Sequence, residues 1–499
     1  MKVLFLEHPR QLFADRQNDI ANTTLASCLN TGYLAARCIE AGYPTRIIEG
    51  YMENLSFDTI YEQIAMDPPD FLGIHLVYNW EDNSHLYRFI EKIKGEFNIS
   101  HVSVYGYYPT FAYLEILNNA PAIDTCMMGE NEITILNLLS SLADFSEVQG
   151  IAARKGDGFI QSRGQQVQDL DSLPFPIRKP SSYPGGEVNI FGSRGCYGNC
   201  TFCYINPYYE GDHIAQGKWR GRSPENIVRE IDHILATTDY RYFYFTDPNF
   251  YGPGRNGRKR VLALAELLKT RKIRFGIEAR ANDIDEETTA ALVDAGLQNI
   301  LVGLESGKDE SLKRLNKHTT VSDNENALRI LRRHGIEPNV GFIMFEPDST
   351  LNDLKVNLDF LKRNDLLEHL DISVNVLYHH QIILAGSQSY QQLAELGRLR
   401  VSEHSVYEAD TDYIHTEVAM FAKIMRDITN HLFDYMKDTW QDYHERKPET
   451  VAIYNEINEV LVAAFEECLQ TLKAKTFHEE EGLAYVEKIN QKIDSIISH

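Results

Sequence analysis

The chain has 499 residues, of which 43% are hydrophobic and 24% are charged. This is an ordinary globular composition, which excludes a disordered or fibrous chain, and at roughly 150 residues per domain the length predicts about three domains. The formal net charge of −23 excludes a general binder of nucleic acid or of anionic membrane, because such binding depends on clustered cations.

Neither a membrane span nor a leader peptide is expected. No apolar run approaches the length of about 18 residues that a transmembrane helix needs. The first apolar run ends at Leu6, which is too short for the core of a signal peptide. We therefore expect a cytoplasmic protein, in which clustered cysteines bind metal or do chemistry more often than they form disulfides.

The first 145 residues alternate buried strands with helical patterns. Strands are expected over 3–6, 45–49, 71–76, 102–105 and 125–128, and helices over 31–41, 86–94 and 133–142. This alternation predicts a Rossmann-like, doubly wound parallel sheet with its ligand site at the carboxyl ends of the strands. A turn is expected over 106–110. Residues 146–185 break the pattern and are expected to form a hairpin and a linker.

A second alternation runs from residue 186 to about 395. Strands are expected over 188–191, 242–245, 274–277, 299–302, 339–344 and 370–374, with helices over 224–235, 259–269, 286–295, 321–334 and 351–363. Six such units favour a partial (β/α)6 barrel over the closed eight-unit form. From residue 396 to 499 a period of 3.6 predicts a helical cap, with helices near 414–435, 449–473 and 480–496.

Three of the seven cysteines lie together, directly after a predicted strand. Cys196, Cys200 and Cys203 form a Cys-x3-Cys-x2-Cys pattern, a strong signal in a chain with so few cysteines. Buried structural thiols are one alternative. A structural zinc site is another, but it wants a fourth Cys or His close by. Three thiolates on one loop suit a [4Fe-4S] cluster with one open iron, which is free to hold a substrate or cofactor.

This segment resembles the signature of the radical S-adenosylmethionine (SAM) superfamily, in which an aromatic residue, here Phe202, precedes the third cysteine. The resemblance continues to about residue 390. It is carried by the expected strand ends Thr246–Phe250, Glu278–Arg280, Gly303–Gly307 and Gly341–Pro347. The first 145 residues, with Gly129–Glu132, resemble the cobalamin-binding domain that precedes the barrel in one subclass.

The resemblance implies three cofactors: the [4Fe-4S] cluster held by the three cysteines, SAM, and cobalamin. Two departures from the subclass concern cobalamin. The usual Gly-Gly-x-His-Pro-Thr turn begins here with Tyr105 and Gly106, and no Asp-x-His-x-x-Gly motif supplies a lower histidine ligand. We expect cobalamin against Gly106, with Tyr105 beside it. The alternative is a Rossmann-like domain kept for packing or for a substrate channel.

Further cofactor-binding residues follow from their places at expected strand ends. Arg280 is expected to pair with the SAM carboxylate, since a guanidinium can bind it through two hydrogen bonds. Glu305 is expected to contact the amino group or ribose of SAM. The full set of cofactor contacts is Phe202, Asp247, Asn249, Glu278, Arg280, Glu305, Gly106 and Tyr105. The alternative for each charged residue is an ordinary ion pair or a solvated loop position.

The implied activity is cleavage of SAM to a radical that activates a C–H bond, followed by cobalamin-dependent methylation of a carbon in a small molecule of natural-product type. Two alternatives remain. One is a radical SAM dehydratase, epimerase or oxidoreductase with a vestigial cobalamin domain, and the other is a non-catalytic iron–sulfur sensor. The implied partners are the small-molecule substrate and an external electron donor such as flavodoxin or ferredoxin, with no nucleic acid and no membrane.

Overall fold

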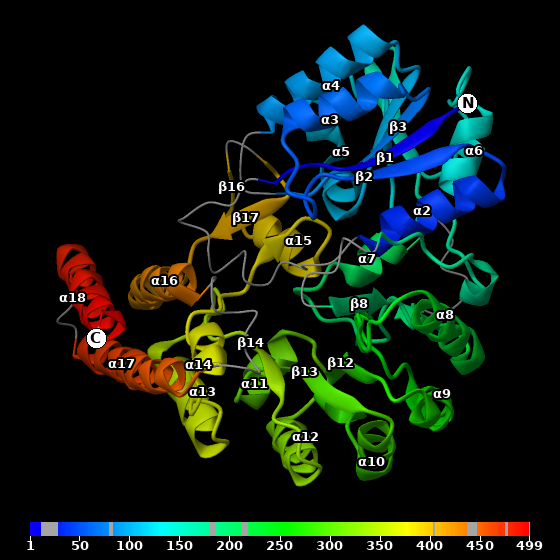
Figure 1. The fold of residues 1–499 in the computed structure, drawn as a ribbon. Helices are drawn as coiled ribbons and strands as arrows, with labels where there is room; N and C mark the ends of the chain where they lie inside the picture. Colours follow the sequence, from blue (N-terminus) through cyan, green and yellow to red (C-terminus); the bar gives the residue numbers. More distant parts are fainter. Residues whose placement is uncertain are drawn as a thin grey trace.

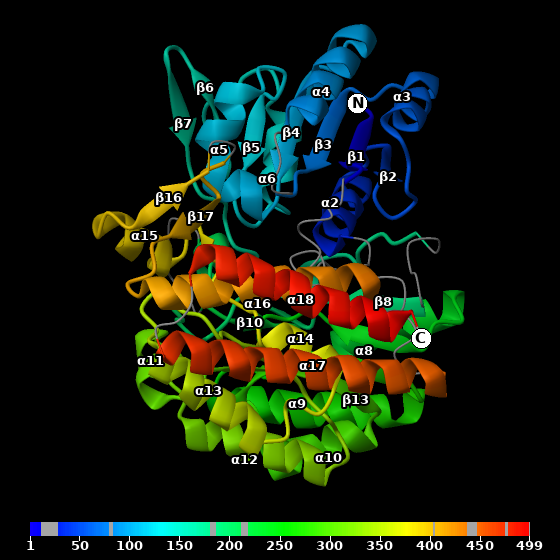
Figure 2. The same ribbon diagram turned by 90° about the vertical axis from the view of Figure 1, so that its left-hand side faces the viewer.

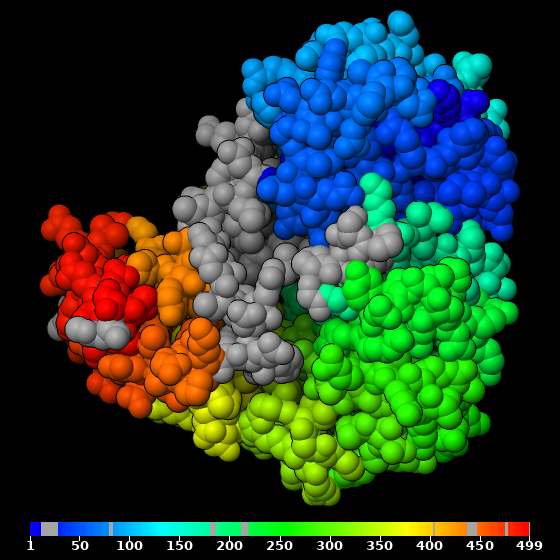
Figure 3. Space-filling view, in the orientation of Figure 1, coloured from blue at the N-terminus to red at the C-terminus, as the bar shows by residue number. Residues whose placement is uncertain are grey.

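The structure, a computed structural model, describes residues 1–10, 28–78, 83–179, 186–210, 218–402, 405–436, 447–474 and 478–498. Two α/β units lie one above the other, and long C-terminal helices lie beside the second unit (Figures 1 and 2). In the space-filling view the first unit is mainly blue, the second is mainly green and the C-terminal helices are orange to red (Figure 3). No helix in the described residues is both long enough and apolar enough to span a bilayer.

The first unit contains the predicted doubly wound sheet, in the order β2-β1-β3-β4-β5-β6-β7. Its strands are β1 (Val3–Glu7), β2 (Thr45–Glu49), β3 (Phe71–His75), β4 (His101–Tyr105), β5 (Thr125–Met127), β6 (Ile151–Lys155) and β7 (Gly158–Gln161). β1 to β5 are parallel. The hairpin β6–β7, expected within the linker, extends this sheet with antiparallel pairing.

Helices cover both faces of this sheet and bury its apolar side chains. One face packs on α2 (Leu29–Glu40) and α6 (Thr134–Ser140). The other packs on α3 (Phe57–Met66), α4 (Ser84–Phe97) and α5 (Tyr107–Asn119). The predicted turn over 106–110 is wrong beyond its first residue. Gly106, with φ 117°, ends β4 and α5 begins at once, because Pro109 is tolerated in the first turn of a helix.

The second unit is an open sheet of five parallel strands in the order β14-β13-β12-β11-β8. The strands are β8 (Glu187–Ile190), β11 (Tyr242–Phe245), β12 (Arg274–Arg280), β13 (Leu297–Glu305) and β14 (Asn339–Phe342). The helices are α8 (Pro224–Thr237), α9 (Gly254–Leu268), α10 (Glu286–Asp294), α11 (Asp309–Arg314), α12 (Val321–Arg333) and α13 (Leu351–Arg363). Short 3-10 turns lie at Lys269–Arg271 and Ala281–Asp283 in this unit and at Leu170–Ser172 in the preceding linker. Its apolar core lies between the sheet and these helices.

The sixth predicted strand is wrong. Residues 370–376 form the helix α14 (Leu370–Val376), which packs on β14 and on the C-terminal helices. A short apolar run fits a buried helix as well as a buried strand, and tertiary packing decides between them. The next segment takes the sixth place, since the backbone N–H of Met344 donates to the His379 carbonyl at 2.9 Å and Phe345 bridges to His380.

A small antiparallel sheet that the sequence did not predict follows α14. It contains β15 (Ile383–Leu384), β17 (Glu408–Thr411) and β16 (Leu399–Val401), with α15 (Gln388–Glu395) beside it. This segment reaches the first unit. The Tyr407 ring lies 5.4 Å from that of Tyr108 on α5, and the backbone N–H of Val406 donates to Glu115 at 2.7 Å.

The three predicted C-terminal helices are α16 (Thr416–Met436), α17 (Pro448–Lys473) and α18 (Glu479–Ile497). They share one core with the barrel. The Phe421 ring lies 5.5 Å from Phe345 at the end of the barrel and 4.5 Å from Phe465 on α17.

Candidate active site

The three clustered cysteines lie on the loop between β9 (Ser193–Arg194) and α7 (Ile205–Tyr209), just beyond the carboxyl end of β8. Gly195 opens the loop with φ 74°, and a Cβ there would lie 1.9 Å from the Lys218 carbonyl, so only glycine fits. Asn206 closes the loop. Its Oδ1 accepts from the Cys196 N–H at 3.0 Å, and its Nδ2 donates to the Gly198 carbonyl at 2.6 Å.

The three thiols are unbridged and only partly buried. Burial raises the pKa of Cys196, and it raises the pKa of Cys203 to about 12. The cations Arg280 and Lys317 oppose that rise at Cys196. Thiols of this kind give up their protons when a metal binds, so the donor set fits an iron–sulfur cluster.

Arg280, at the end of β12, braces this loop. Its Nη1 donates to Cys200 Sγ at 3.4 Å and its Nη2 donates to the Lys317 carbonyl. The loop makes room at Gly198, where a Cβ would lie 2.5 Å from that Nη1. The remaining nitrogen, Nε, is buried and has no hydrogen-bond partner among the described residues. One Nη group therefore contacts the cysteine loop and the other contacts the segment after α11, and a pairing of Arg280 with the SAM carboxylate stays a prediction.

Glu305, at the end of β13, forms an ion pair with Lys317, whose Nζ lies 2.6 Å from Glu305 Oε1. Glu305 has φ 63°, and the pairing with β14 shifts register between Gly303 and Glu305. A glutamate in this region costs of the order of 1–3 kcal/mol, and such strain gathers at functional sites. A Cβ at Gly303 would lie 2.7 Å from both charged atoms, so glycine there makes space for the pair.

Asp247 and Asn249 follow β11 and are completely buried. Asp247 accepts hydrogen bonds from the Gly192 N–H at 2.9 Å and from the Ser193 hydroxyl. Burial raises the pKa of Asp247 to about 6. Asn249 donates to Asp283 at 2.7 Å and accepts from the Gly252 N–H at 2.7 Å. These contacts hold the segment that leads into the cysteine loop, and direct contact of either residue with a cofactor stays a prediction.

Glu278 and Phe202 complete the predicted set in the second unit. Glu278 lies on the inner face of β12, 3.5 Å from the Tyr244 hydroxyl, and burial raises the pKa of its carboxyl to about 7. Asn189, on the inner face of β8, has a buried Oδ1 without a hydrogen-bond partner in the described residues. Phe202 is half-buried between the second and third cysteines. The inner face therefore offers polar groups with unused hydrogen-bonding capacity.

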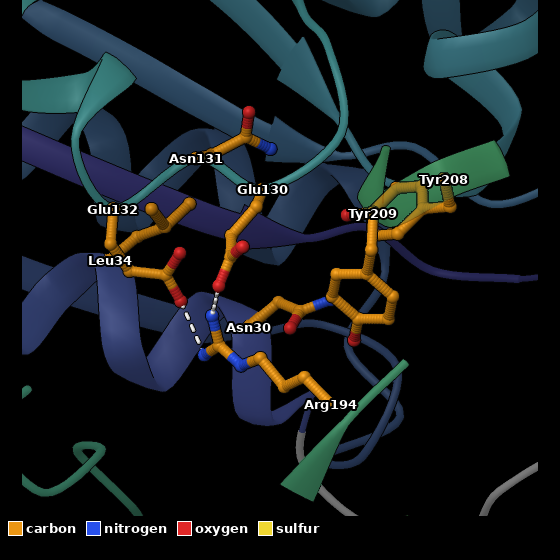
Figure 4. Close-up of a pocket in the computed structure, with 8 residues that line it drawn as sticks. All are labelled: Asn30, Leu34, Glu130, Asn131, Glu132, Arg194, Tyr208 and Tyr209. Carbon is orange, nitrogen blue, oxygen red and sulfur yellow. Dashed lines mark hydrogen bonds and ion pairs between the residues drawn. The ribbon is translucent and has the colours of Figure 1, made fainter. Parts of the chain in front are cut away.

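A buried ion network joins the cysteine loop to the first unit (Figure 4). Arg194, two residues before the first cysteine, donates to Glu130 and, at 2.6 Å, to Glu132. Arg220, on β10 (Arg220–Gly221), lies 2.9 Å from the other Glu130 oxygen. Burial alone would lower the pKa of Arg194, but the two carboxylates raise it well above its ordinary value. No role in the site was predicted from the sequence for Arg194, Arg220 or Lys317, although Arg194 lies two residues before the first cysteine.

Tyr105 and Gly106 lie at the carboxyl end of β4. The Tyr105 ring is fully buried between the sheet and α2, where its hydroxyl lies 2.7 Å from Thr31 Oγ1. It packs edge-on against Phe5. The ring therefore does not project beyond the sheet at Gly106, and the bulk of Tyr105 does not exclude cobalamin from this edge.

Comparisons with known proteins agree with this geometry. Residues 190–361 match the model of the radical SAM superfamily. An uncharacterized methyltransferase of Pyrococcus horikoshii is 26% identical over 381 residues, covering 73% of this chain and 79% of that protein. The 4′-phospho-dehydrooxetanocin synthase of Priestia megaterium is 30% identical over 352 residues, covering 64% of this chain but 46% of the relative.

Two solved structures share the fold. The cobalamin-dependent SAM radical enzyme OxsB, with aqua-cobalamin and SAM bound, has a TM-score of 0.80 at 19% identity, covering 100% of this chain and 80% of that chain. The radical SAM methyltransferase TsrM of Kitasatospora setae, with cobalamin and a [4Fe-4S] cluster bound, has a TM-score of 0.65 at 13% identity, covering 94% and 100%. Residues 190–361 of the protein therefore carry a radical SAM domain, and the chain has the two-unit α/β fold of OxsB.

Proposed function

We propose that this protein is a radical SAM methyltransferase that uses a [4Fe-4S] cluster, SAM and cobalamin to methylate a carbon atom of a small molecule of natural-product type. The observation that carries the proposal is the loop of three thiols beside Arg280 and Lys317, held by an ion network against the first α/β unit. That arrangement suits a metal cluster that acts on a ligand lying between the two units.

The residues divide into ligands, contacts and positioning groups. Cys196, Cys200 and Cys203 hold the cluster. Glu305, Glu278 and Phe202 face SAM, while Asp247, Asn249 and Arg280 fix the loop. Gly106 and Tyr105 form the edge that meets cobalamin. When bound, the cluster supplies an electron to SAM and the corrinoid supplies a methyl group.

The relatives support this assignment. The Pyrococcus relative is named a methyltransferase, and OxsB and TsrM, which share this fold, have been solved with cobalamin bound. We assign residues 1–145 to the cobalamin unit, 146–185 to a linker with its hairpin, 186–395 to the radical SAM barrel and 396–499 to a helical cap. The protein acts in the cytoplasm and takes its electron from a donor such as flavodoxin or ferredoxin.

One observation favours a second candidate. The Priestia relative is named a synthase rather than a methyltransferase. A radical SAM dehydratase, epimerase or oxidoreductase with a vestigial cobalamin domain is therefore the alternative outcome.

Anaerobic purification with added hydroxocobalamin, followed by cluster reconstitution, tests the proposal. We expect a one-to-one corrin spectrum that survives desalting, together with formation of 5′-deoxyadenosine from SAM. Loss of the corrin with steady 5′-deoxyadenosine formation would favour the second candidate.

Single alanine substitutions of Cys196, Cys200 and Cys203 test the cluster ligands in the same preparation. Each should abolish iron–sulfur absorbance and turnover, because three ligands are the fewest that leave one iron open. Cys38→Ala is the matched control, since Cys38 is buried in the first unit. A cluster that survived in any of the three variants would overturn the assignment.

A further inference from the structure

A second group of reactive side chains lies in the first unit, away from the cysteine loop. The strand order β2-β1-β3-β4-β5 places the switch point of the sheet between β1 and β3, because the chain leaves these neighbouring strands in opposite directions. Ligands of doubly wound sheets bind at this point, beyond the carboxyl ends of the strands. Glu7 and His75 are the last residues of β1 and β3, and they lie opposite each other in register. Cys28 is the N-cap residue of α2.

The three side chains form a chain of contacts. Cys28 Sγ lies 3.9 Å from His75 Nε2, and His75 Nδ1 lies 2.9 Å from Glu7 Oε2. One ligand atom of each residue lies within 4.8 Å of the other two. Glu7 is only 2% exposed and is fixed by two further groups. The Thr31 hydroxyl donates to Oε1, and Arg10 Nη2 lies 3.1 Å from Oε2.

We infer that Cys28, His75 and Glu7 form a nucleophilic triad, in which Cys28 attacks a soft electrophile at the switch point of the first sheet. A nucleophile, a base within hydrogen-bond reach and a third group that orients the base are the diagnostic signature of covalent catalysis. The contact between sulfur and imidazole is often loose before a ligand binds. Cleavage of SAM at the cysteine loop is not needed for this inference.

Cys28 lies at the N-terminus of α2 and beside the His75 ring, two features that activate thiols. A thiol at a helix N-terminus and beside an imidazolium is ionised more readily than a free thiol. Burial alone would lower the pKa of His75, but Cys28 and Glu7 raise it to about 10. Among the described residues, the other titratable groups facing the triad are Arg10 and His8 after β1, Tyr105 of β4 and Tyr208 of α7, and burial keeps both phenols neutral.

A metal site is the alternative for these three residues. One ligand atom of each lies within 4.8 Å of the other two, and three protein ligands are the number that a catalytic zinc site provides. The 2.9 Å contact between His75 Nδ1 and Glu7 Oε2 instead engages atoms of two of the three residues with each other, which favours an oriented sulfur over a cage for a bare ion.

Two kinds of electrophile can react with the Cys28 sulfur in this way. With an alkyl carbon, a Cys28 lone pair forms the S–C bond, and the leaving group departs with the electrons of the broken bond and can take the His75 proton. With a cobalt(III) corrinoid, the sulfur lone pair forms a dative bond and displaces bound water, with no change of oxidation state. Neither step needs an oxidant or a reductant.

Alkylation kinetics test the triad in the full-length protein. Iodoacetamide modification of Cys28, followed by peptide mass spectrometry, should be nearly independent of pH between about 6 and 9. In His75→Gln the rate at pH 6 should fall by roughly a hundredfold, since an ordinary thiol with a pKa near 8.5 is almost fully protonated there. Glu7→Gln should give an intermediate profile.

The pH dependence of Cys28 alkylation in the wild-type protein tests the triad even if a variant fails to fold. A rate that rises tenfold per pH unit up to about 8.5, as for an ordinary thiol, would overturn the triad. Aquacobalamin then separates the two electrophiles. If the aquacobalamin spectrum changes with wild type but not with Cys28→Ser, the electrophile is cobalt. If Cys28 is alkylated but the aquacobalamin spectrum does not change, the electrophile is carbon. If Cys28 reacts with neither probe while 5′-deoxyadenosine still forms, the triad is wrong and the proposed function stands.

Discussion

At the scale of single residues, Glu305 combines three unusual properties. It is largely buried, it has a positive φ, and its partner Lys317 is also buried. Breaking such a pair from one side leaves an uncompensated buried charge, which costs about 3–5 kcal/mol. A solvated loop glutamate would have none of these properties, so the structure excludes a solvated position for Glu305, while its contact with SAM stays a prediction.

Glu305→Gln should lower the free energy of unfolding by about 3–5 kcal/mol and weaken SAM binding about ten- to a hundredfold. Adding Lys317→Met should restore most of the stability but not the affinity, because it removes the orphaned charge without replacing the carboxylate. Urea unfolding and equilibrium dialysis of SAM measure the two effects. Glu310→Gln, at an exposed position on α11, is the control. Wild-type SAM affinity in Glu305→Gln would remove the residue from the site.

The charge on His75 should also appear in the pH dependence of stability. Its folded pKa of about 10 lies above the ordinary 6.5, so its contribution is complete below pH 6.5 and is lost as the pH rises toward 10. Relative to His75→Gln, wild type should lose up to about 1.4 kcal/mol per pH unit in that window. Urea midpoints at pH 6, 8 and 10 measure this difference. The exposed His233→Gln should leave the slope unchanged, and parallel curves for wild type and His75→Gln would contradict the charged state.

Sequence distance explains which site residues could be predicted. The three cysteines lie within one short loop, so their spacing carries the signal by itself. Lys317 meets Glu305 across 12 residues, and Arg194 meets Glu130 across 64. No local pattern marks such partners, because each depends on how strands from different parts of the chain are brought together. The sequence was sufficient to place Tyr105 at the carboxyl edge of the first sheet, but it could not predict the direction in which the Tyr105 ring points.

At the scale of elements, β9 and the turn after β5 are joined by charges rather than by apolar packing. Arg194, Glu130 and Glu132 are all at most 4% exposed. A buried network of this kind tolerates little change, since each group relies on the others for solvation. The position of the cysteine loop thus depends on residues of the other unit.

Arg194→Met should therefore destabilise the protein by about 3–5 kcal/mol and reduce the iron retained after reconstitution. The reason is that two buried carboxylates lose their main partner directly before Cys196. Iron per chain and urea midpoints are the measurements, with the exposed Arg229→Met as the matched control. A full iron complement at wild-type stability would show that the network does not position the loop.

The alternation of strands and helices was predictable because each period extends over many residues. Strands β1 to β5, β8 and β11 to β14 all lie where the sequence placed them. The error at α14 has a physical cause, since Leu370–Val376 is buried on several sides and carries no periodicity that separates helix from strand. The small sheet of β15 to β17 escaped prediction because its strands are two to four residues long.

At the scale of the whole molecule, the described residues contain two main apolar regions. The core of the barrel continues without a break into α16, α17 and α18, while the first sheet has cores of its own. The barrel and the C-terminal helices should therefore unfold together, and the first unit separately.

Phe465→Ala tests this division, because Phe465 is completely buried where the cap meets the barrel. We expect a loss of about 3–5 kcal/mol, seen as faster hydrogen exchange in β12 and β13 as well as in α17, with β1 and β3 unchanged. Leu117 on α5 is also completely buried, and Leu117→Ala should give faster hydrogen exchange in β1 and β3, with β12, β13 and α17 unchanged. Loss of protection confined to the C-terminal helices would show that the cap is a separate unit.

The segment from β15 to β17 has a mechanical consequence. The chain crosses from the first unit to the barrel once before β8, and it returns to the first unit at Ala385 and Tyr407 before entering α16. Ser389, within this return, also donates its N–H to the Thr201 carbonyl of the cysteine loop at 2.8 Å. These two connections act together with the ion network of Arg194 with Glu130 and Glu132, which joins the units at a third place. A large ligand that enters between the units therefore does so without their full separation.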